Sequence, residues 1–363
     1  MTRGPIMIMA GGTGGHVFPG LAVAAALRAR DRSVVWLGTQ RGLEARVVPT
    51  HGIDIEWITI AGVRGRGVLA WAAAPFRIAR AVGQALGALR RRRPAAVLGM
   101  GGFVAGPGGF AAWLTRRPLL LHEQNAVAGT TNRLLAPLAT RIFAAFPGSF
   151  PGRRDDEVIG NPVRATIAAT DSPRARLRAR EHERRRLLVV GGSQGARILN
   201  QTLPRALAAL PARQRPEVWH QCGRNGVDEA RKAYADVGIE ARVEPFIDDV
   251  ANAYRWADLV VARAGGITLA ELGVVGVGAI LVPFRAAIDD HQTRNAEHFT
   301  RAGAGLMIAE QELTPQALGA ALASCLGDFE RLVAFAEAAR AQAHADAAEV
   351  LAAACVTAAE ARA

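Results

Sequence analysis

The chain has 363 residues, 50% of them hydrophobic and 21% charged, and a net charge of +12. This length and composition indicate a folded protein of about two domains and exclude a disordered chain and collagen. Three cysteines without a CxxC pair exclude a disulfide framework and a zinc ribbon. The sequence shows no signal peptide, and its longest apolar stretch, Leu272–Phe284, is shorter than the ~20 residues that span a bilayer. We therefore expect a cytoplasmic protein without a transmembrane segment.

The first half of the chain alternates short apolar strands with helical stretches. A glycine loop, Gly11–Gly15, follows the first strand and precedes a helix predicted over Pro19–Ala29. A second glycine-rich loop is predicted over Gly99–Gly109. Alternating strands and helices indicate a parallel α/β sheet. The predicted strands are Ile6–Ala10, Val34–Leu37, Ala95–Leu98, Leu119–His122 and Arg141–Ala145.

The polar, arginine-rich segment Ala168–Arg186 interrupts this rhythm, after which the pattern starts again. Strand Leu187–Val190, loop Gly191–Gly195 and helix Ala196–Ala209 repeat the beginning of the chain about 180 residues later. We therefore predict two doubly wound, Rossmann-like α/β domains with a ligand cleft at the carboxyl ends of their strands. The remaining predictions are strands at Glu217–Gln221, Arg242–Glu244, Leu259–Ala262 and Ala279–Val282, and helical structure over Phe329–Ala363.

The two glycine loops are candidate anion sites. A strand followed by glycines and a helix presents backbone N–H groups at the positive end of the helix dipole, where a phosphate binds. Thr13 and Ser193 add hydroxyl donors; the alternative is that both loops are only tight turns. Val17 replaces the third glycine of a dinucleotide fingerprint, which disfavours NAD. The only lysine, Lys232, follows an arginine, which excludes a P-loop.

Four further polar positions are candidate site residues. His16 lies directly after the first glycine loop, near a helix N-terminus that favours a neutral imidazole and therefore a general base; the alternative is a packing histidine. Glu271 follows Gly265 and Gly266, where its carboxylate could accept hydrogen bonds from the two hydroxyls of a ribose. The alternative is that it only interacts favourably with the dipole of the helix that begins there. The run His122–Asn125 is expected to line the cleft, and Ala126 stands where a zinc helix needs its second histidine. The cluster Asp289–Gln292 is either a metal site or, more commonly, a helix start.

Charge is distributed unevenly along the chain. Residues 57–122 contain no Asp or Glu, and apolar side chains stand among their arginines. Apolar residues beside arginines are typical of a surface that binds anionic lipid. The alternative, packing in a core, would explain the apolar residues but not the arginines. Two tyrosines and the absence of a groove-reading motif disfavour nucleic acid. The candidate membrane residues are Trp71, Phe76, Arg77, Arg80, Trp113, Arg116 and Arg117.

Six motifs in order resemble those of one family, the MurG family of bacterial N-acetylglucosaminyltransferases of peptidoglycan synthesis. The resemblance extends from about Ile6 to about Gly305. The chain departs from the family pattern at Ala264, Gly266, Gly278 and Ala286. The motifs are Gly11–Pro19, Gly99–Phe103, His122–Asn125, Gly160–Arg164, Gly191–Ala196 and Asp289–Thr293.

The resemblance implies the GT-B fold and a hexosyltransferase. It implies that residues 1–163 form an acceptor and membrane-docking domain, that 164–340 bind UDP-N-acetylglucosamine, and that 341–363 form a helix packed back toward the first domain. The implied reaction transfers N-acetylglucosamine, with inversion, to the muramoyl 4-hydroxyl of lipid I and forms lipid II, without a metal or cofactor. The implied location is the cytoplasmic face of the bacterial inner membrane, peripherally on anionic phospholipid. Other cell-wall and division proteins are the further partners that it implies.

The family's site residues carry over by motif. Ser193 and its loop would hold the diphosphate, Ile247 would meet uracil through its backbone, and Glu271 would bind the ribose. His16 would be the base, with Gly12, Thr13 and Gly14 on the acceptor side. The implied donor-binding residues are Thr13, Gly14, Gly15, Asn125, Arg164, Ser193, Ile247, Gly266, Ile267, Thr268, Leu269, Ala270, Glu271 and Gln292. Two alternatives remain: a GT-B transferase with another lipid or small-molecule acceptor, and a catalytically silent scaffold of cell-wall assembly.

Overall fold

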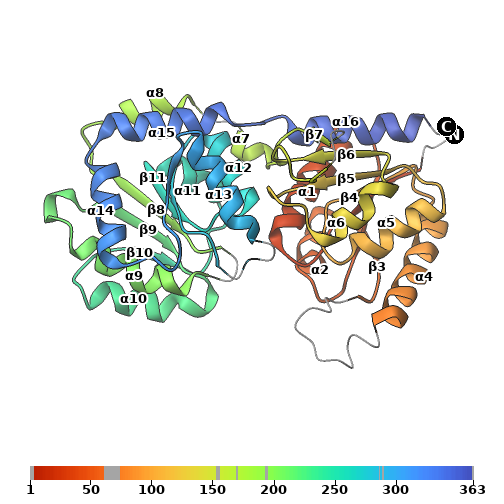
Figure 1. Ribbon diagram of the computed structural model, residues 1–363, viewed down its shortest axis with the longest axis horizontal. Helices are drawn as coiled ribbons and strands as arrows, with labels where there is room; N and C mark the ends of the chain where they lie inside the picture. Colours follow the sequence, from red (N-terminus) through yellow and green to blue (C-terminus); the bar gives the residue numbers. More distant parts are fainter. Residues whose placement is uncertain are drawn as a thin grey trace. The chain divides into compact units, whose positions relative to one another are not determined.

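The computed structural model describes residues 4–60, 74–152, 156–168, 171–192, 195–285, 287 and 290–361. Its contacts divide the chain into two compact units (Figure 1). The first unit comprises Met1–Arg164 together with Ala345–Ala363, and the second comprises Ala165–His344. Each unit contains one parallel sheet with helices packed on it, so the predicted pair of Rossmann-like domains is confirmed.

The first sheet has seven parallel strands in the order β3-β2-β1-β4-β5-β6-β7. The order reverses at β1, so chain segments leave the carboxyl ends of β1 and β4 in opposite directions, and ligands bind at such a switch point. The strands are β1 (Ile6–Met9), β2 (Val34–Gly38), β3 (Asp54–Trp57), β4 (Ala96–Gly99), β5 (Leu119–Glu123), β6 (Arg141–Ala144) and β7 (Asp156–Val158).

Two hydrophobic layers cover the two faces of this sheet. Ile6 and Ile8 of β1 belong to one cluster, which includes side chains of α1 and α16, whereas Met7 and Met9 belong to the other, with α4 and α5. Successive strand side chains point to opposite faces, so a strand covered on both sides is apolar throughout. The helices are α1 (Gly14–Arg28), α2 (Glu44–Val47), α4 (Ala74–Arg92), α5 (Ala105–Leu114), α6 (Thr130–Leu135) and α16 (Ala347–Glu360).

The last helix of the chain belongs to the first unit. Leu351 and Cys355 of α16 are fully buried in the cluster that contains Val23 and Leu27 of α1. At the surface, Arg30 forms an ion pair of 2.8 Å with Glu349. Helix α16 therefore completes the core of a unit whose other residues, Met1–Arg164, precede the whole second unit in the chain.

The second unit repeats the doubly wound pattern with six parallel strands in the order β10-β9-β8-β11-β12-β13. Its strands are β8 (Arg186–Val190), β9 (Glu217–Gln221), β10 (Arg242–Glu244), β11 (Leu259–Ala262), β12 (Gly278–Leu281) and β13 (Gly305–Met307). Its helices are α7 (Ala165–Ala168), α8 (Pro173–Arg178), α9 (Arg197–Ala208), α10 (Val227–Ala235), α11 (Val250–Trp256), α12 (Gly266–Val275), α13 (His291–Arg301), α14 (Pro315–Leu326) and α15 (Phe329–Ala341). Short 3-10 turns lie at Pro49–His51, Ala136–Leu138, Ala212–Gln214 and Arg224–Gly226.

Two predicted boundaries were wrong. Helix α1 begins at Gly14 and not at Pro19, because the extended Thr13 caps it and its carbonyl accepts the N–H of His16 and Val17. Helix α5 begins at Ala105, inside the predicted loop Gly99–Gly109. The strands β3, β7 and β13 were also missed, and all three lie at sheet edges.

Leu351→Ala is expected to destabilise the first unit by about 2–5 kcal/mol, because it leaves a cavity in a closed core. The matched control is Val350→Ala, one residue earlier and 36% exposed, which should change the stability by less than about 0.5 kcal/mol. Hydrogen exchange resolved by segment measures both: α1 and α16 should lose protection in Leu351→Ala while β8 and β11 keep theirs. Equal effects of the two variants would contradict the placement of α16 in this core.

Candidate functional site

Each unit places a set of glycine turns and polar side chains at the carboxyl ends of its strands. In the first unit these follow β1, β4 and β5, and in the second they follow β8, β10, β11 and β12. Parallel strands end at a common edge, so residues far apart in the sequence meet there.

A buried carboxylate holds the first glycine loop. The side chain of Glu44 is fully buried, and its Oε2 accepts the N–H of Gly12 at 2.9 Å. Its Oε1 accepts the N–H and the hydroxyl of Thr39 at 2.9 and 2.7 Å. One N–H of the predicted anion loop is therefore already used within the protein. The N–H groups of Gly14 and Gly15, the first two of α1, have no partner in the described part of the chain.

The turn after β4 packs directly on this loop. Gly101 and Gly102 both have positive φ angles, +94° and +78°. A Cβ at Gly102 would overlap the carbonyl oxygen of Gly11, and a Cβ at Gly101 would lie 3.0 Å from the His16 ring. Only glycine satisfies both the backbone conformation and this contact.

His16 is the third residue of α1 and lies beside the end of β5. Its Nδ1 is 2.9 Å from Oε1 of Gln124. The Nε2 of Gln124 is 3.0 Å from Nδ1 of His122 and donates to the carbonyl oxygen of His122 at 3.0 Å. The Nε2 of His122 in turn lies 2.9 Å from the carbonyl oxygen of Gly160. Gln124, the third residue of the motif His122–Asn125, thus links this motif to His16, which directly follows the first glycine loop.

His122 does not line an open surface as we expected, because its side chain is fully buried. Burial lowers the pKa of His122 to about 4, although the contact with the Gly160 carbonyl favours the charged form. The imidazole is therefore neutral at pH 7.

Glu123 is also buried and organises the segment that follows β5. Its carboxylate accepts the N–H and the amide of Asn125 at 3.1 and 3.2 Å, the N–H of Gly129 at 3.1 Å and the amide of Asn132 at 2.9 Å. Asn125 is half-buried and is oriented by these contacts. The Arg164 guanidinium lies over the Phe18 ring, 5.5 Å from its centroid.

In the second unit, Gln221 at the end of β9 holds the second glycine loop. Its Oε1 accepts the N–H of Gly192 at 2.9 Å, and its Nε2 donates to the carbonyls of Gly192 and Pro245 at 3.1 and 3.0 Å. We did not single out Gln221 in the sequence, although a polar residue at the carboxyl end of a strand was a usable signal. Ser193 lies outside the described residues.

Helix α12 begins at the turn after β11, as the glycine pattern indicated. Gly265 precedes the helix with extended backbone and no side-chain cap, so the first N–H groups, those of Gly266, Ile267 and Thr268, point out of the helix end. Of the predicted donor contacts, Gly266 and Leu269 are buried, and Ile267, Thr268 and Ala270 are half-buried. Glu271 is 7% exposed, and its Oε2 accepts the hydroxyl of Tyr254 at 3.2 Å.

The loops after β10 and β12 carry the other predicted donor residues. Ile247 is buried, and Gln292 is the second residue of α13. The Oε1 of Gln292 accepts the N–H of Phe284 at 2.9 Å, which leaves its Nε2 oriented to donate. The buried Asn295 donates to the carbonyl of Ala264 at 3.0 Å and ties α13 to the turn before α12. Ala286 and Asp289 lie outside the described residues.

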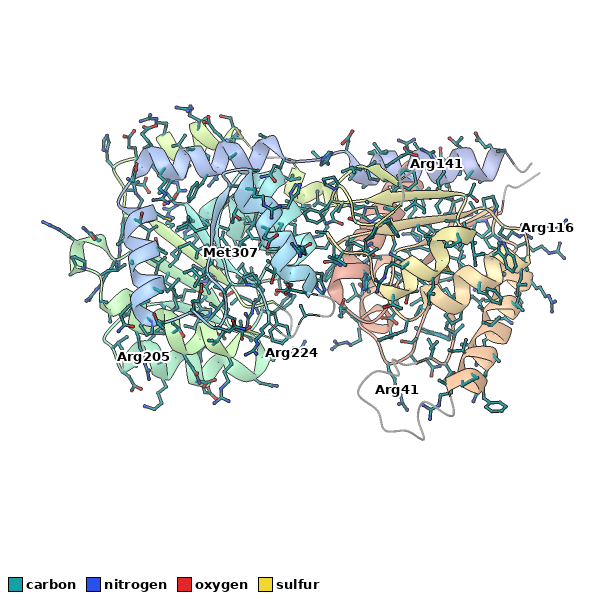
Figure 2. The ribbon with its side chains drawn as sticks, viewed as in Figure 1. Arg41, Arg116, Arg141, Arg205, Arg224 and Met307 are labelled. Carbon is teal, nitrogen blue, oxygen red and sulfur yellow. The ribbon has the colours of Figure 1, made fainter. Side chains whose placement is uncertain are left out.

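Exposed apolar side chains gather on three helices of the first unit that pack in series, α4 on α5 and α5 on α6. Phe76 is 81% and Leu134 72% exposed, and Trp113 stacks on Phe110 at 5.6 Å. Arg77 and Arg80 of α4 and Arg116 after α5 are exposed, and Figure 2 shows Arg116 pointing away from the protein. Arg117 instead donates to the Pro94 carbonyl at 2.8 Å. Trp71 lies outside the described residues.

The described residues contain neither a candidate metal cluster nor a candidate membrane span. No group of three or more His, Cys, Asp or Glu side chains within the ranges given above is placed to hold a metal ion. No helix in those ranges is both long and apolar enough to cross a membrane.

Comparison with known proteins finds, over nearly the whole chain, a similarity to the family that the sequence motifs indicated. Models of the glycosyltransferase family 28 N-terminal and C-terminal domains match residues 6–144 and 186–351. The UDP-N-acetylglucosamine--N-acetylmuramyl-(pentapeptide) pyrophosphoryl-undecaprenol N-acetylglucosamine transferase of Nitrosococcus oceani is 57% identical over 92% of this chain and 93% of its own. The protein of the same name from Alkalilimnicola ehrlichii is 55% identical over 97% and 98%. The crystal structure of Acinetobacter baumannii MurG has a TM-score of 0.83 at 39% identity, and covers 98% of this chain and 99% of that one.

Gly102→Ala is expected to destabilise the first unit more than Gly148→Ala does. Both glycines have φ near +75°, which costs alanine about 1–2 kcal/mol, but a Cβ at Gly148 meets no atom within 4 Å. The overlap with the Gly11 carbonyl should add about 1–3 kcal/mol at Gly102. Urea unfolding of the two variants measures the difference, and equal losses would show that the two glycine turns are not in backbone contact.

Proposed function

Because the chain belongs to glycosyltransferase family 28, we propose that it transfers N-acetylglucosamine from UDP-N-acetylglucosamine to the muramoyl 4-hydroxyl of lipid I and so forms lipid II in peptidoglycan synthesis. The observation that carries this proposal is the match, over more than nine-tenths of the chain, to relatives named for this transfer. The glycine turns and polar side chains at the strand ends of both units support it.

The second unit binds the donor nucleotide in this proposal. The N–H groups that begin α12 hold the diphosphate together with Ser193, whereas the N–H groups of Gly191, Gly192 and Gly195 are already bonded within the protein. Glu271 accepts the ribose hydroxyls, and the contact with Tyr254 keeps its carboxylate in place. The backbone of Ile247 meets uracil. Gln292 donates to the sugar through Nε2, because Phe284 already occupies its Oε1.

The first unit binds the acceptor and supplies the base. Nε2 of His16 takes the proton of the acceptor hydroxyl while its oxygen forms a bond to the anomeric carbon. The bond between that carbon and the β-phosphate oxygen breaks, and its electron pair leaves with UDP, on the face opposite the attack, so the anomeric configuration inverts. Gly12, Thr13, Gly14 and Gly15 face the lipid diphosphate and the reacting sugar, and Asn125 and Arg164 help Gln292 to bind the sugar of the donor.

Neither a metal nor a cofactor is part of this proposal, and UDP-N-acetylglucosamine is a substrate. The charge that develops on the leaving UDP is stabilised by N–H groups that are already oriented in the folded protein, which is the arrangement that lowers a barrier most. The helix dipole of α12 adds to this effect because its positive end faces the diphosphate.

The first unit also docks on the membrane in this proposal, on the cytoplasmic face of the inner membrane where the lipid-linked acceptor is made available. Exposed phenyl and aliphatic side chains beside arginines suit an interface with anionic lipid. Two pairs of arginines on α4 differ in their partners. Arg91 and Arg92 are paired with Glu56 at the β3 edge, whereas Arg77 and Arg80 have no carboxylate partner in the described part of the chain. The proposal that cell-wall and division proteins are further partners is based only on the family resemblance.

Transfer of labelled N-acetylglucosamine to a lipid I analogue in the presence of EDTA tests the reaction. The wild type should transfer the sugar without added metal, and His16→Ala should lower kcat about 10²–10⁴-fold with donor affinity nearly unchanged, because a general base contributes that much. His51→Ala is the matched control, since His51 is an exposed histidine of the same unit.

Three other outcomes are informative. Donor binding without transfer would favour another acceptor, and no donor binding would favour a silent scaffold. Full activity of His16→Ala would remove His16 from the base role while leaving the transfer itself in place.

The double variant Arg77→Gln/Arg80→Gln is expected to bind anionic phospholipid vesicles about thirtyfold more weakly. Each arginine near such a surface contributes about 1 kcal/mol, so the pair contributes about 2 kcal/mol. Vesicle co-sedimentation measures this, and added salt should reduce the difference. Arg205→Gln/Arg231→Gln removes the same charge from exposed positions of the second unit and should bind as the wild type does. Equal loss in both variants would mean that net charge, and not this helix, determines binding.

A further inference from the structure

A chain of hydrogen bonds leads from the carbonyl of Gly160 to the ring of His16, and its direction can be assigned. A carbonyl oxygen only accepts, so the Nε2 of His122, 2.9 Å away, carries a proton. Burial keeps the His122 imidazole neutral, since it lowers its pKa to about 4. The Nδ1 of His122 is therefore unprotonated and accepts.

The side-chain amide of Gln124 has only one orientation that fits. Its Nε2 lies 3.0 Å from Nδ1 of His122 and 3.0 Å from the carbonyl oxygen of His122, and both of these atoms accept. A reversed amide would place Oε1 against two acceptors. Oε1 therefore faces His16, whose Nδ1 lies 2.9 Å away. Because Oε1 can only accept, Nδ1 of His16 carries the proton.

The backbone around these side chains is held in place as well. The amide of Asn161 donates to the carbonyl of Gln124 at 3.0 Å, so the segment after β5 is tied to the segment after β7 that contains Gly160. Gly101 lies beside the same edge of the His16 ring, where a Cβ would be 3.0 Å from Nδ1 and Cε1. The ring is thus positioned by contacts and oriented by one hydrogen bond.

We propose that His122 and Gln124 form a tautomer relay, which holds neutral His16 as the Nδ1–H tautomer and leaves the lone pair of Nε2 as its proton acceptor. The relay concerns the protein alone, and only its use in catalysis rests on the proposed function. Within the described ranges, Nε2 of His16 has no hydrogen-bond partner. In the other tautomer, Nε2 would present an N–H to the acceptor hydroxyl and could not take its proton.

His122 and Gln124 are positioning residues in this proposal, because each is at most 2% exposed and acts through His16. An amide oxygen has a particular advantage over a carboxylate at this place. It carries no full charge, so it fixes the ring orientation with a weaker electrostatic attraction than a carboxylate would exert. The Nδ1–H bond to Oε1 persists when Nε2 gains the proton, so the ring does not reorient during the transfer.

Nitrogen NMR of the full chain labelled with ¹⁵N-histidine tests the tautomer directly. The sequence has eight histidines, and His16→Gln identifies the His16 signals by their loss. At a pH where the ring is neutral, the wild type should show a protonated Nδ1 and an unprotonated Nε2 for His16. Gln124→Leu removes the acceptor, and the Nε2–H form that free histidine prefers should then appear.

Kinetics supply the second readout. Gln124→Leu should lower kcat about 10–100-fold with the donor KM unchanged, which is the usual effect of losing a group that orients a catalytic side chain. His122→Phe should do the same, and His122→Asn should retain more activity because its amide oxygen can accept from Gln124 near the position of Nδ1. The matched control is His220→Phe. His220 is a buried, neutral histidine of the second unit, with Tyr234 at 3.0 Å, and its loss should leave the His16 nitrogen signals unchanged.

The outcomes separate the relay from the reaction. An Nε2–H majority at His16 in the wild type would overturn the relay, and this result requires no variant to fold. An Nδ1–H majority that persists in folded Gln124→Leu would show that Gln124 does not determine the tautomer, and would also overturn it. The expected spectra in a protein that fails to transfer the sugar would leave the relay in place and contradict the proposed function.

Discussion

Gly102 packs so closely on the carbonyl of Gly11 that no side chain fits between them, and the site of the first unit depends on this contact. It brings together the turns after β1 and β4, the two strands at which the sheet reverses its order. With these turns in contact, His16 at the start of α1 lies beside Gly101 and within reach of Gln124 after β5. A side chain larger than hydrogen at Gly102 would separate the turns, and the histidine would lose its partner.

Buried polar side chains pair with the backbone groups of these loops, as ladder hydrogen bonds pair the backbone groups of the strands. Turns at strand ends leave backbone groups without partners, and an unpaired buried group costs about as much as a lost hydrogen bond. Glu44 and Glu123 accept such groups in the first unit, and Gln221 and Asn295 pair with them in the second. These backbone groups are therefore held in place before any ligand arrives. Rigidity at the strand ends is what electrostatic stabilisation of a leaving diphosphate requires.

Local sequence patterns were sufficient for the central strands and the glycine turns. Apolar runs mark strands that are covered on both faces, and glycines mark turns that need a positive φ or a close backbone approach. The prediction of two doubly wound sheets followed from these alone, and the six ordered motifs indicated the family that the comparisons confirmed. The edge strands β3, β7 and β13 were missed, although the alternation of apolar and acidic residues over Ile53–Trp57 and the apolar run Leu306–Ile308 were usable signals. The start of α1 was misplaced because Pro19 suggested a first turn that lies five residues earlier.

The sequence by itself determined the fold, the family and the residue types at each strand end. Only the tertiary structure decided which of these side chains meet: Gly12 with Glu44, Tyr254 with Glu271, and His16 with Gln124, which are 108 residues apart. The orientation of the His16 ring follows from a carbonyl after β7 and an amide after β5, and no local pattern contains both. Strand and turn propensities act over a few neighbouring residues, whereas a hydrogen bond between loops depends on the order and register of the whole sheet.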